Sequence, residues 1–117
     1  AILESLKDDT SLFVREAVAK ACGNIGDKAW TRAILQRLQN DISTSVIEAC
    51  GRIGDKDWTR AILESLKDDT SLFVREAVAV ACGNIGDNNS TRAILQSLKE
   101  DTSACVKICV VEALLKN

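Results

Sequence analysis

The sequence contains no histidine and no proline, and two Trp and two Phe are its only aromatic residues. Histidine is the commonest general base and a frequent metal ligand, so its absence removes most catalytic arrangements and most zinc sites. Apolar residues make up 46% of the chain and aromatic residues only 3%. Together with the lack of proline, these values favour helices that pack through small and aliphatic side chains.

The chain also lacks an excess of basic residues and any long apolar run. Its net charge is −2 over 117 residues, whereas a nucleic-acid-binding protein would present a basic face. No run approaches 18 consecutive apolar residues, so no membrane-spanning helix is expected. No signal peptide is visible, and we expect a cytoplasmic protein that binds neither nucleic acid nor membrane.

The five cysteines do not form the pattern of a disulfide framework. Cys22, Cys50 and Cys82 follow an alanine at the same place in successive copies of a repeated phrase, which predicts buried, reduced thiols. Cys105 and Cys109 stand four residues apart, so they could share one face of a helix. Without histidine or a Cys-x-x-Cys motif, we expect no metal site and no cofactor.

One phrase recurs along the chain. Residues 1–27 and 61–87 differ at a single position, which is Lys20 in the first copy and Val80 in the other. A shorter copy begins at Ala33 and a truncated copy at Ala93. Self-similarity with a period of about 30 residues predicts stacked repeats within one domain. The predicted boundaries are approximately 1–32, 33–60, 61–92 and 93–117.

Each repeat is predicted to contain two helices, and the second carries an apolar stripe with the spacing i, i+3, i+4, i+7, i+8. If this stripe faces the core, Glu16, Ala19 and Lys20 point away from it. The stripe comprises Val14, Ala17, Val18, Ala21, Cys22 and Ile25, then Val46, Ala49, Cys50 and Ile53, then Val74, Ala77, Val78, Ala81, Cys82 and Ile85, and finally Val106, Cys109, Val110, Ala113 and Leu114.

Turn residues mark the helix ends. Glycines at 26, 54 and 86 suit the residue that ends the second helix, and the Asp that follows each could cap the next helix. Trp30 and Trp58 fall on the apolar face of the shorter first helix, where we expect them to be buried. Glycines at 23, 51 and 83 leave two alternatives: the helix frays there, or it continues and leaves room for a neighbour.

Repeat two is abnormal. Matching Val46, Glu48 and Ala49 to Val14, Glu16 and Ala17 leaves no equivalent of residues 18–21. Four residues are about one helical turn, so we expect a shortened second helix and a local notch or change of curvature.

The segments Leu-Lys-Asp-Asp, Val-Arg-Glu-Ala-Val-Ala and Ala-Cys-Gly-Asn-Ile-Gly-Asp resemble the HEAT-like repeat named after the phycobilisome lyases. The resemblance implies an all-α, right-handed superhelix of about four helix pairs. It also implies that Arg15 and Arg75 support the turns between repeats by pairing with aspartates such as Asp9 and Asp69. Repeat two departs from this pattern, because Ile47 stands where Arg15 does.

In such solenoids the second helices line the concave face, which would form a partner-binding groove. Phe13 and Phe73 are either aromatic anchors of that groove or residues packed between helix pairs, and we favour the packing. The candidate groove residues are Leu12, Phe13, Glu16, Lys20, Glu48, Leu72, Phe73, Glu76, Val80 and Ile108.

These observations predict a non-catalytic scaffold that binds an as yet unknown protein partner. The paired carboxylates Asp8 and Asp9 recur in the turns and are interpreted as helix caps rather than acid–base groups. The resemblance alone implies an alternative, a phycobilin lyase or lyase-like chromophore chaperone. A second alternative is self-association through the N-terminal end, because Ile2, Leu3 and Leu6 lack the lead-in segment of other copies.

Overall fold

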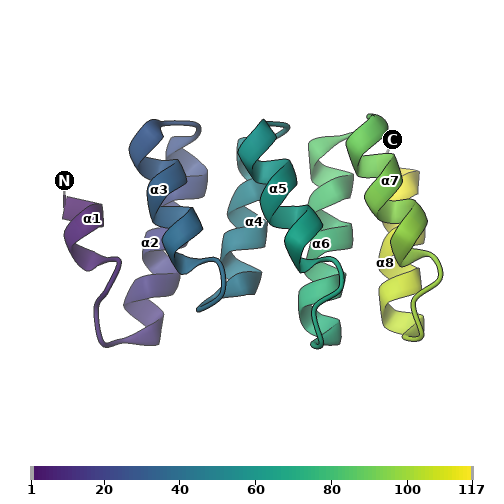
Figure 1. The fold of residues 1–117 in the computed structure, drawn as a ribbon, viewed down its shortest axis with the longest axis horizontal. Coiled ribbons are helices and arrows are strands. Elements are labelled where there is room, and N and C mark those ends of the chain that lie inside the picture. The colour runs from purple at the N-terminus through teal and green to yellow at the C-terminus, as the bar shows by residue number, and fades with distance from the viewer. Residues whose placement is uncertain (1, 117) are drawn as a thin grey trace.

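A computed structural model describes residues 2–116, and Ala1 and Asn117 lie outside the described part. These residues form four helix pairs and no strand, which confirms the expected all-helical solenoid. The molecule measures 40 × 24 × 19 Å, with one helix of each pair in the front layer and the other behind it (Figure 1). The helices are α1 (Ile2–Leu6), α2 (Leu12–Ile25), α3 (Ala29–Leu38), α4 (Ser43–Ile53), α5 (Asp57–Leu66), α6 (Leu72–Ile85), α7 (Asn89–Leu98) and α8 (Ala104–Leu115).

Serine side chains begin three of the second helices. Ser11, Ser71 and Ser103 have extended backbones, and each hydroxyl accepts a hydrogen bond from a backbone N–H in the first turn. Such a cap satisfies an N–H group that has no partner inside the helix. The second helices α2, α4 and α6 end at glycines 26, 54 and 86, whose φ values are 100°, 100° and 107°. Only glycine adopts this conformation without strain, so the predicted helix ends are confirmed.

The aspartates that follow these glycines do not cap the next helix, and that prediction was wrong. The N-cap residues of α3, α5 and α7 are Lys28, Lys56 and Asn88, one position later. Because Asp27 lies outside the first turn, its carboxylate is free to accept a hydrogen bond of 3.0 Å from the indole N–H of Trp58. Trp58 is buried, as expected, whereas Trp30 is only half-buried.

A buried threonine organises each of these turns. The hydroxyl of Thr59 accepts a hydrogen bond of 2.9 Å from the backbone N–H of Lys56 and lies 2.7 Å from the carbonyl oxygen of Gly54. Thr31 and Thr91 repeat both contacts in their own turns, and all three side chains are buried. Each threonine therefore ties the end of one helix pair to the start of the next.

The core follows the predicted stripe in part. Val18 and Cys22 are buried, but Ile25 and Leu114 are exposed, and Ala19, expected to point outward, is completely buried. In α8, Val111 occupies the position that Ala19 occupies in α2. No helix pair follows α8 within residues 2–116, and Val111 is exposed. The next helix pair therefore buries Ala19, and the buried face of a second helix includes residues outside the predicted stripe.

Glycines inside the second helices allow these helices to pack closely. The helices continue through residues 23, 51 and 83, so the second of the two predicted alternatives holds. A Cβ atom on Gly23 or Gly83 would lie 2.9 Å from the Cα atom of Ala49 or Ala113, and one on Gly51 would lie 3.3 Å from that of Ala81. Each glycine thus receives an alanine of the next repeat, and a larger side chain would push the two helices apart.

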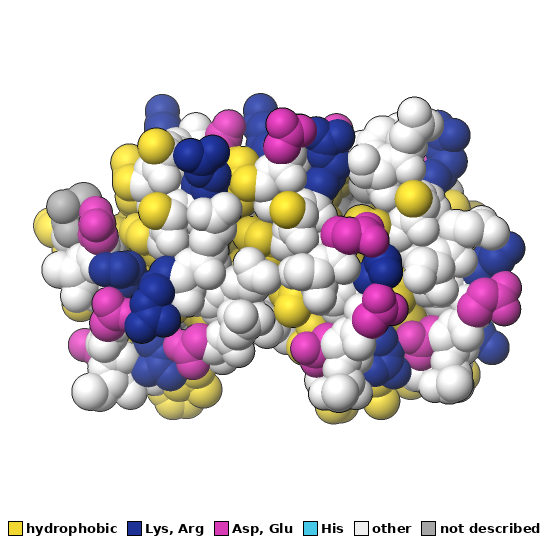
Figure 2. All heavy atoms as spheres, viewed as in Figure 1, with side chains coloured by type: hydrophobic (Ala, Val, Ile, Leu, Met, Phe, Trp, Pro, Cys, Tyr) yellow, Lys and Arg dark blue, Asp and Glu magenta, His cyan; other side chains and the backbone are white. Residues whose placement is uncertain are grey.

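The second helix of repeat two is short, as predicted, with 11 residues in α4 against 14 in α2 and α6. Figure 2 shows the edge of the molecule hollowed between the α3–α4 turn and the α5–α6 turn. However, Ala49 packs on Gly23 as Ala81 packs on Gly51, so Ala49 corresponds to Ala21 and not to Ala17. The missing residues therefore lie at the start of the helix, and Ile47 takes the buried position of Ala19.

Arginines connect neighbouring repeats, but not through the predicted carboxylates. The Arg75 Nε donates to the Oδ2 of Asp101 at 2.8 Å, and its Nη1 donates to the backbone carbonyl of Asp69 at 2.8 Å. Arg15 makes the same contacts with the carboxylate of Asp41 and the carbonyl of Asp9. The carboxylate of Asp69 accepts a hydrogen bond from the backbone N–H of Ser71, and Arg75 reaches Asp69 through its backbone carbonyl.

Candidate partner-binding groove

Three adjoining hollows run along the second helices. They lie between α2 and α4, between α4 and α6, and between α6 and α8, with volumes of about 230, 430 and 260 Å³. Glu48 and Arg52 line the first two hollows, and Val80 and Cys109 line the last two. The hollows therefore form one groove along the stack, to which all four second helices contribute.

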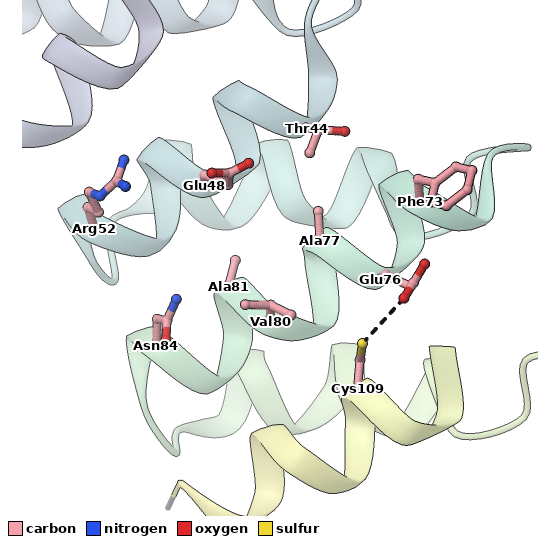
Figure 3. Close-up of a pocket in the computed structure, with 10 residues that line it drawn as sticks. All are labelled: Thr44, Glu48, Arg52, Phe73, Glu76, Ala77, Val80, Ala81, Asn84 and Cys109. Carbon is pink, nitrogen blue, oxygen red and sulfur yellow. Dashed lines mark hydrogen bonds between the residues drawn. The ribbon is translucent and has the colours of Figure 1, made fainter. Parts of the chain in front are cut away.

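The central hollow, between α4 and α6, is lined by side chains of three helices. Phe73 stands at one end and Arg52 and Asn84 at the other (Figure 3). Most of its lining surface is apolar, and six of its ten lining residues belong to α6. The lining residues are Thr44, Glu48 and Arg52 of α4, Phe73, Glu76, Ala77, Val80, Ala81 and Asn84 of α6, and Cys109 of α8.

The α6 wall follows directly from helical spacing. Residues at positions i, i+3, i+4, i+7 and i+8 share one face, and the lining residues from Phe73 to Ala81 have these offsets. Ala77 and Ala81 have short side chains, and both line the central hollow (Figure 3). Glu48 and Arg52 share a face of α4 because they are four residues apart.

The charged side chains of the groove take no part in the ion pairs of the protein. Ten ion pairs are formed within residues 2–116, all in turns, first helices or the first turns of α2 and α6. None of the ten involves a residue that lines the groove. The charged lining residues are Glu16, Lys20, Glu48, Arg52, Glu76, Glu112 and Lys116.

The cysteines beneath and beside the groove are held as thiols. Burial raises the pKa of Cys50 and of Cys82 to about 12, and for Cys82 the charge of Glu64 adds to the effect. Burial also raises the pKa of Cys109, and the negative charge of Glu76 adds to this effect. The Cys109 thiol donates a long hydrogen bond of 3.7 Å to the carboxylate of Glu76. Within residues 2–116, no group of cysteines and carboxylates is arranged to hold a metal ion.

The structure brings six of the ten predicted groove residues to the groove, namely Glu16, Lys20, Glu48, Phe73, Glu76 and Val80. Leu12, Phe13, Leu72 and Ile108 lie outside its lining. That the lining residues bind a partner is still a prediction.

The expectation that both phenylalanines pack between helix pairs was wrong. Phe13 is 80% exposed and Phe73 is 70% exposed. Each precedes the valine that turns toward the core, and one residue along a helix is a rotation of about 100°. Val74 is buried, so Phe73 is turned outward.

Sequence reasoning missed the far end of the central hollow. Arg52 could have been found, because it stands four residues after Glu48 on a predicted helix. Asn84 and Cys109 gave no such signal, since Asn84 lies near a helix end and Cys109 was assigned to the core stripe. Cys109 is half-buried, with its thiol at the edge of the groove.

Comparison with known families agrees with this architecture. A family model for HEAT repeats matches residues 42–115, and a model for the PBS lyase HEAT-like repeat matches residues 14–40. No curated protein matches the chain. No helix between residues 2 and 116 combines the length and apolar character needed to cross a membrane. The first match covers more than half of the sequence, and the helix pairs, glycine turns and stacked second helices accord with it; the chain belongs to the HEAT repeat family.

Proposed function

We propose that this protein is a non-catalytic scaffold that binds a segment of a partner protein in the groove along α2, α4, α6 and α8. The family supports this function, because stacked helix pairs form extended concave surfaces suited to binding other chains. The residues present suit binding better than chemistry, since the chain has no histidine and the pKa values of Cys50, Cys82 and Cys109 are raised.

The observation that carries the proposal is the contrast between the groove and the rest of the surface. Most charged side chains outside the groove belong to the ten ion pairs, whereas none of the charged side chains that line the groove does, and the groove also has an exposed phenylalanine. Aromatic residues and arginine are enriched at protein–protein interfaces, and Phe73 and Arg52 both line the central hollow.

Val80 offers a direct test, because the first copy of the repeat carries Lys20 at the same position. Val80→Lys should therefore leave the free energy of unfolding within about 0.5 kcal/mol of the original, as for surface substitutions. Peptides selected by phage display against the protein should bind this variant at least about tenfold more weakly, since a charge replaces part of the apolar lining.

The matched control is Gln96→Lys, which places the same charge on an exposed position of α7, outside the groove lining. It should leave the affinity of the selected peptides unchanged. Peptides that bind both variants as well as the original protein would show that the groove is not the binding surface.

A second function is favoured by one observation, the match of residues 14–40 to the PBS lyase HEAT-like repeat. On this proposal the protein handles a bilin chromophore. Mixing the protein with a bilin and an apo-phycobiliprotein should then change the absorbance spectrum of the pigment. An unchanged spectrum, with no pigment retained by the protein, would dispose of this alternative.

A further inference from the structure

We propose that the central hollow binds a basic side chain, arginine or lysine, of the partner segment. This inference rests on the proposed function and specifies its partner: a protein segment whose basic residue lies between α4 and α6. It is carried by the two carboxylates of the hollow, by the single difference between residues 1–27 and 61–87, and by the lining of Phe73 and alanines.

Two carboxylates stand on different helices around the hollow. Glu48 comes from α4 and Glu76 from α6, and both line the space between these helices (Figure 3). Among the contacts within residues 2–116, Glu48 forms no ion pair, and Glu76 accepts only the 3.7 Å contact from the Cys109 thiol. A partner cation placed between them would meet two negative charges without having to displace an internal ion pair.

The comparison of Lys20 with Val80 shows that α6 brings no cation to the groove at the position where α2 brings one. On α2, Lys20 stands four residues after Glu16 and lines the hollow between α2 and α4. On α6, Val80 stands four residues after Glu76, and both residues line the central hollow. The carboxylate of Glu76 therefore has no lysine one turn away on its own helix.

The apolar part of the lining suits the long stem of a basic side chain. Ala77, Val80 and Ala81 line the hollow on the α6 side, where methylene groups of lysine or arginine could pack. Phe73 stands beside Glu76 at one end, and its ring is exposed. A cation near the face of an aromatic ring gains further attraction, and arginine also stacks on it.

Arg52 is the one cation in the lining of the central hollow, and it lies at the end opposite Phe73 (Figure 3). Asn84 lies at the same end. This arrangement gives the hollow a direction: Glu76 and an aromatic ring lie at one end, Glu48 lies in the middle, and Arg52 and Asn84 lie at the other end. We infer that the basic side chain points toward Phe73 and that a backbone carbonyl of the partner segment lies toward Arg52 and Asn84.

The test uses the whole protein and synthetic ten-residue peptide libraries, each with one residue type fixed at the central position. Libraries with fixed arginine or lysine should bind at least about fivefold more tightly than those with fixed glutamine or leucine. Glu48→Gln and Glu76→Gln should each weaken the binding of the arginine library by about fivefold, the upper range for exposed ion pairs. Glu100→Gln removes an exposed carboxylate in the α7–α8 turn, outside the groove, and should change nothing.

Phe73→Leu should reduce the preference for arginine while it keeps an apolar side chain at that position. Its matched control is Phe13→Leu, the equivalent residue of the first copy, which lies outside the groove lining. Circular dichroism of each variant checks that the helices are intact. Binding of the neutral libraries that equals binding of the basic ones, or variants at Glu48 and Glu76 that bind arginine as before, would overturn this inference alone. If no library binds at all, the proposed function fails with it.

Discussion

At the scale of single residues, the buried threonines of the glycine turns show how one hydroxyl can hold two helix pairs together. Thr59 accepts a hydrogen bond from the N–H of Lys56 and contacts the carbonyl oxygen of Gly54. Both backbone groups belong to a turn that the threonine covers, so water is a poor substitute for the hydroxyl.

Thr59→Val, which keeps the shape of the side chain and removes the hydroxyl, should therefore lower the free energy of unfolding by about 1–3 kcal/mol, the cost of leaving buried polar groups unsatisfied. Urea unfolding followed by circular dichroism measures this difference. Thr70→Val, at an exposed turn position, is the control and should change the value by less than about 0.5 kcal/mol. Equal effects of the two substitutions would mean that the hydroxyl of Thr59 contributes nothing to the turn.

The sequence could predict these turns only in part. Gly54 and Asp55 were visible as a helix end and a polar neighbour, which led to the assignment of the aspartate as the cap. The cap position in fact falls one residue later, and the decisive contact comes from a threonine inside the helix. Helix boundaries are uncertain by one or two residues from sequence alone, which is enough to exchange the roles of two polar side chains.

At the scale of helices, the packing of one second helix on the next depends on a glycine that faces an alanine. The contact is tighter at Gly23 and Gly83, where a Cβ atom would lie 2.9 Å from a backbone carbon, than at Gly51, where the distance is 3.3 Å. Glycine inside a helix costs about 1 kcal/mol relative to alanine, so its presence requires a compensating gain in packing.

Gly83→Ala should destabilise the protein by about 1–3 kcal/mol, because the new methyl group overlaps the backbone of α8. Gly51→Ala should change the free energy of unfolding by less than about 1 kcal/mol, since its weaker overlap is offset by the better helix propensity of alanine. Thermal and urea unfolding of the two variants gives the comparison. A Gly83→Ala variant more stable than the original protein would contradict the packing described.

The ion pair of Arg75 with Asp101 connects α6 to the turn before α8 and predicts a dependence on pH. The hydrogen bond from Arg75 holds the pKa of Asp101 below its ordinary value. An aspartate whose pKa is lowered by folding stabilises the folded state above its unfolded pKa of about 3.9, and that stability is lost as the pH falls through the folded value.

Arg75→Gln should therefore lower the free energy of unfolding at pH 7, and its difference from the original protein should shrink as the pH falls below about 3.9. The contacts of Arg75 with backbone carbonyls do not titrate, so part of the difference should persist. Arg92→Gln breaks an exposed pair with Asp87 and should cost less than Arg75→Gln at pH 7. A pH-independent difference for Arg75→Gln would show that the carboxylate of Asp101 is not its important partner.

Helix packing also explains where the sequence comparison of repeat two failed. Sequence similarity matched Ala49 to Ala17. The contacts between helices show instead that Ala49 occupies the position of Ala21, because it packs against Gly23. The sequence predicted that α4 is short. It did not predict that the missing residues lie at the start of α4, because this depends on how α4 packs against its neighbours.

At the scale of the whole molecule, the repetition of one phrase was sufficient to predict a stack of helix pairs, because each copy needs its neighbours to bury its apolar stripe. The groove was predictable in outline, since Glu16, Lys20, Glu48 and Glu76 all lie on the outward side of the predicted second helices. The central hollow could not be predicted from the sequence, because it lies where small residues of α6 face the shortened helix α4.

Self-association through the N-terminal end stays a prediction, and light scattering over a range of concentrations would test it. Ile2 is 80% exposed, and the apolar residues Val111, Leu114 and Leu115 are exposed on α8 at the other end. A molecular mass that stays at 12.7 kDa at all concentrations would exclude self-association under those conditions.

NMR chemical-shift mapping tests directly whether partners bind along the second helices, as proposed. An arginine-containing peptide is titrated into the isotope-labelled protein, and the amide signals of the two nearly identical copies are compared. We expect the signals of α4 and α6 around the central hollow to shift most, and the equivalent signals of α2 to shift less. Shifts concentrated on α3, α5 and α7, with the second helices unchanged, would contradict the proposal.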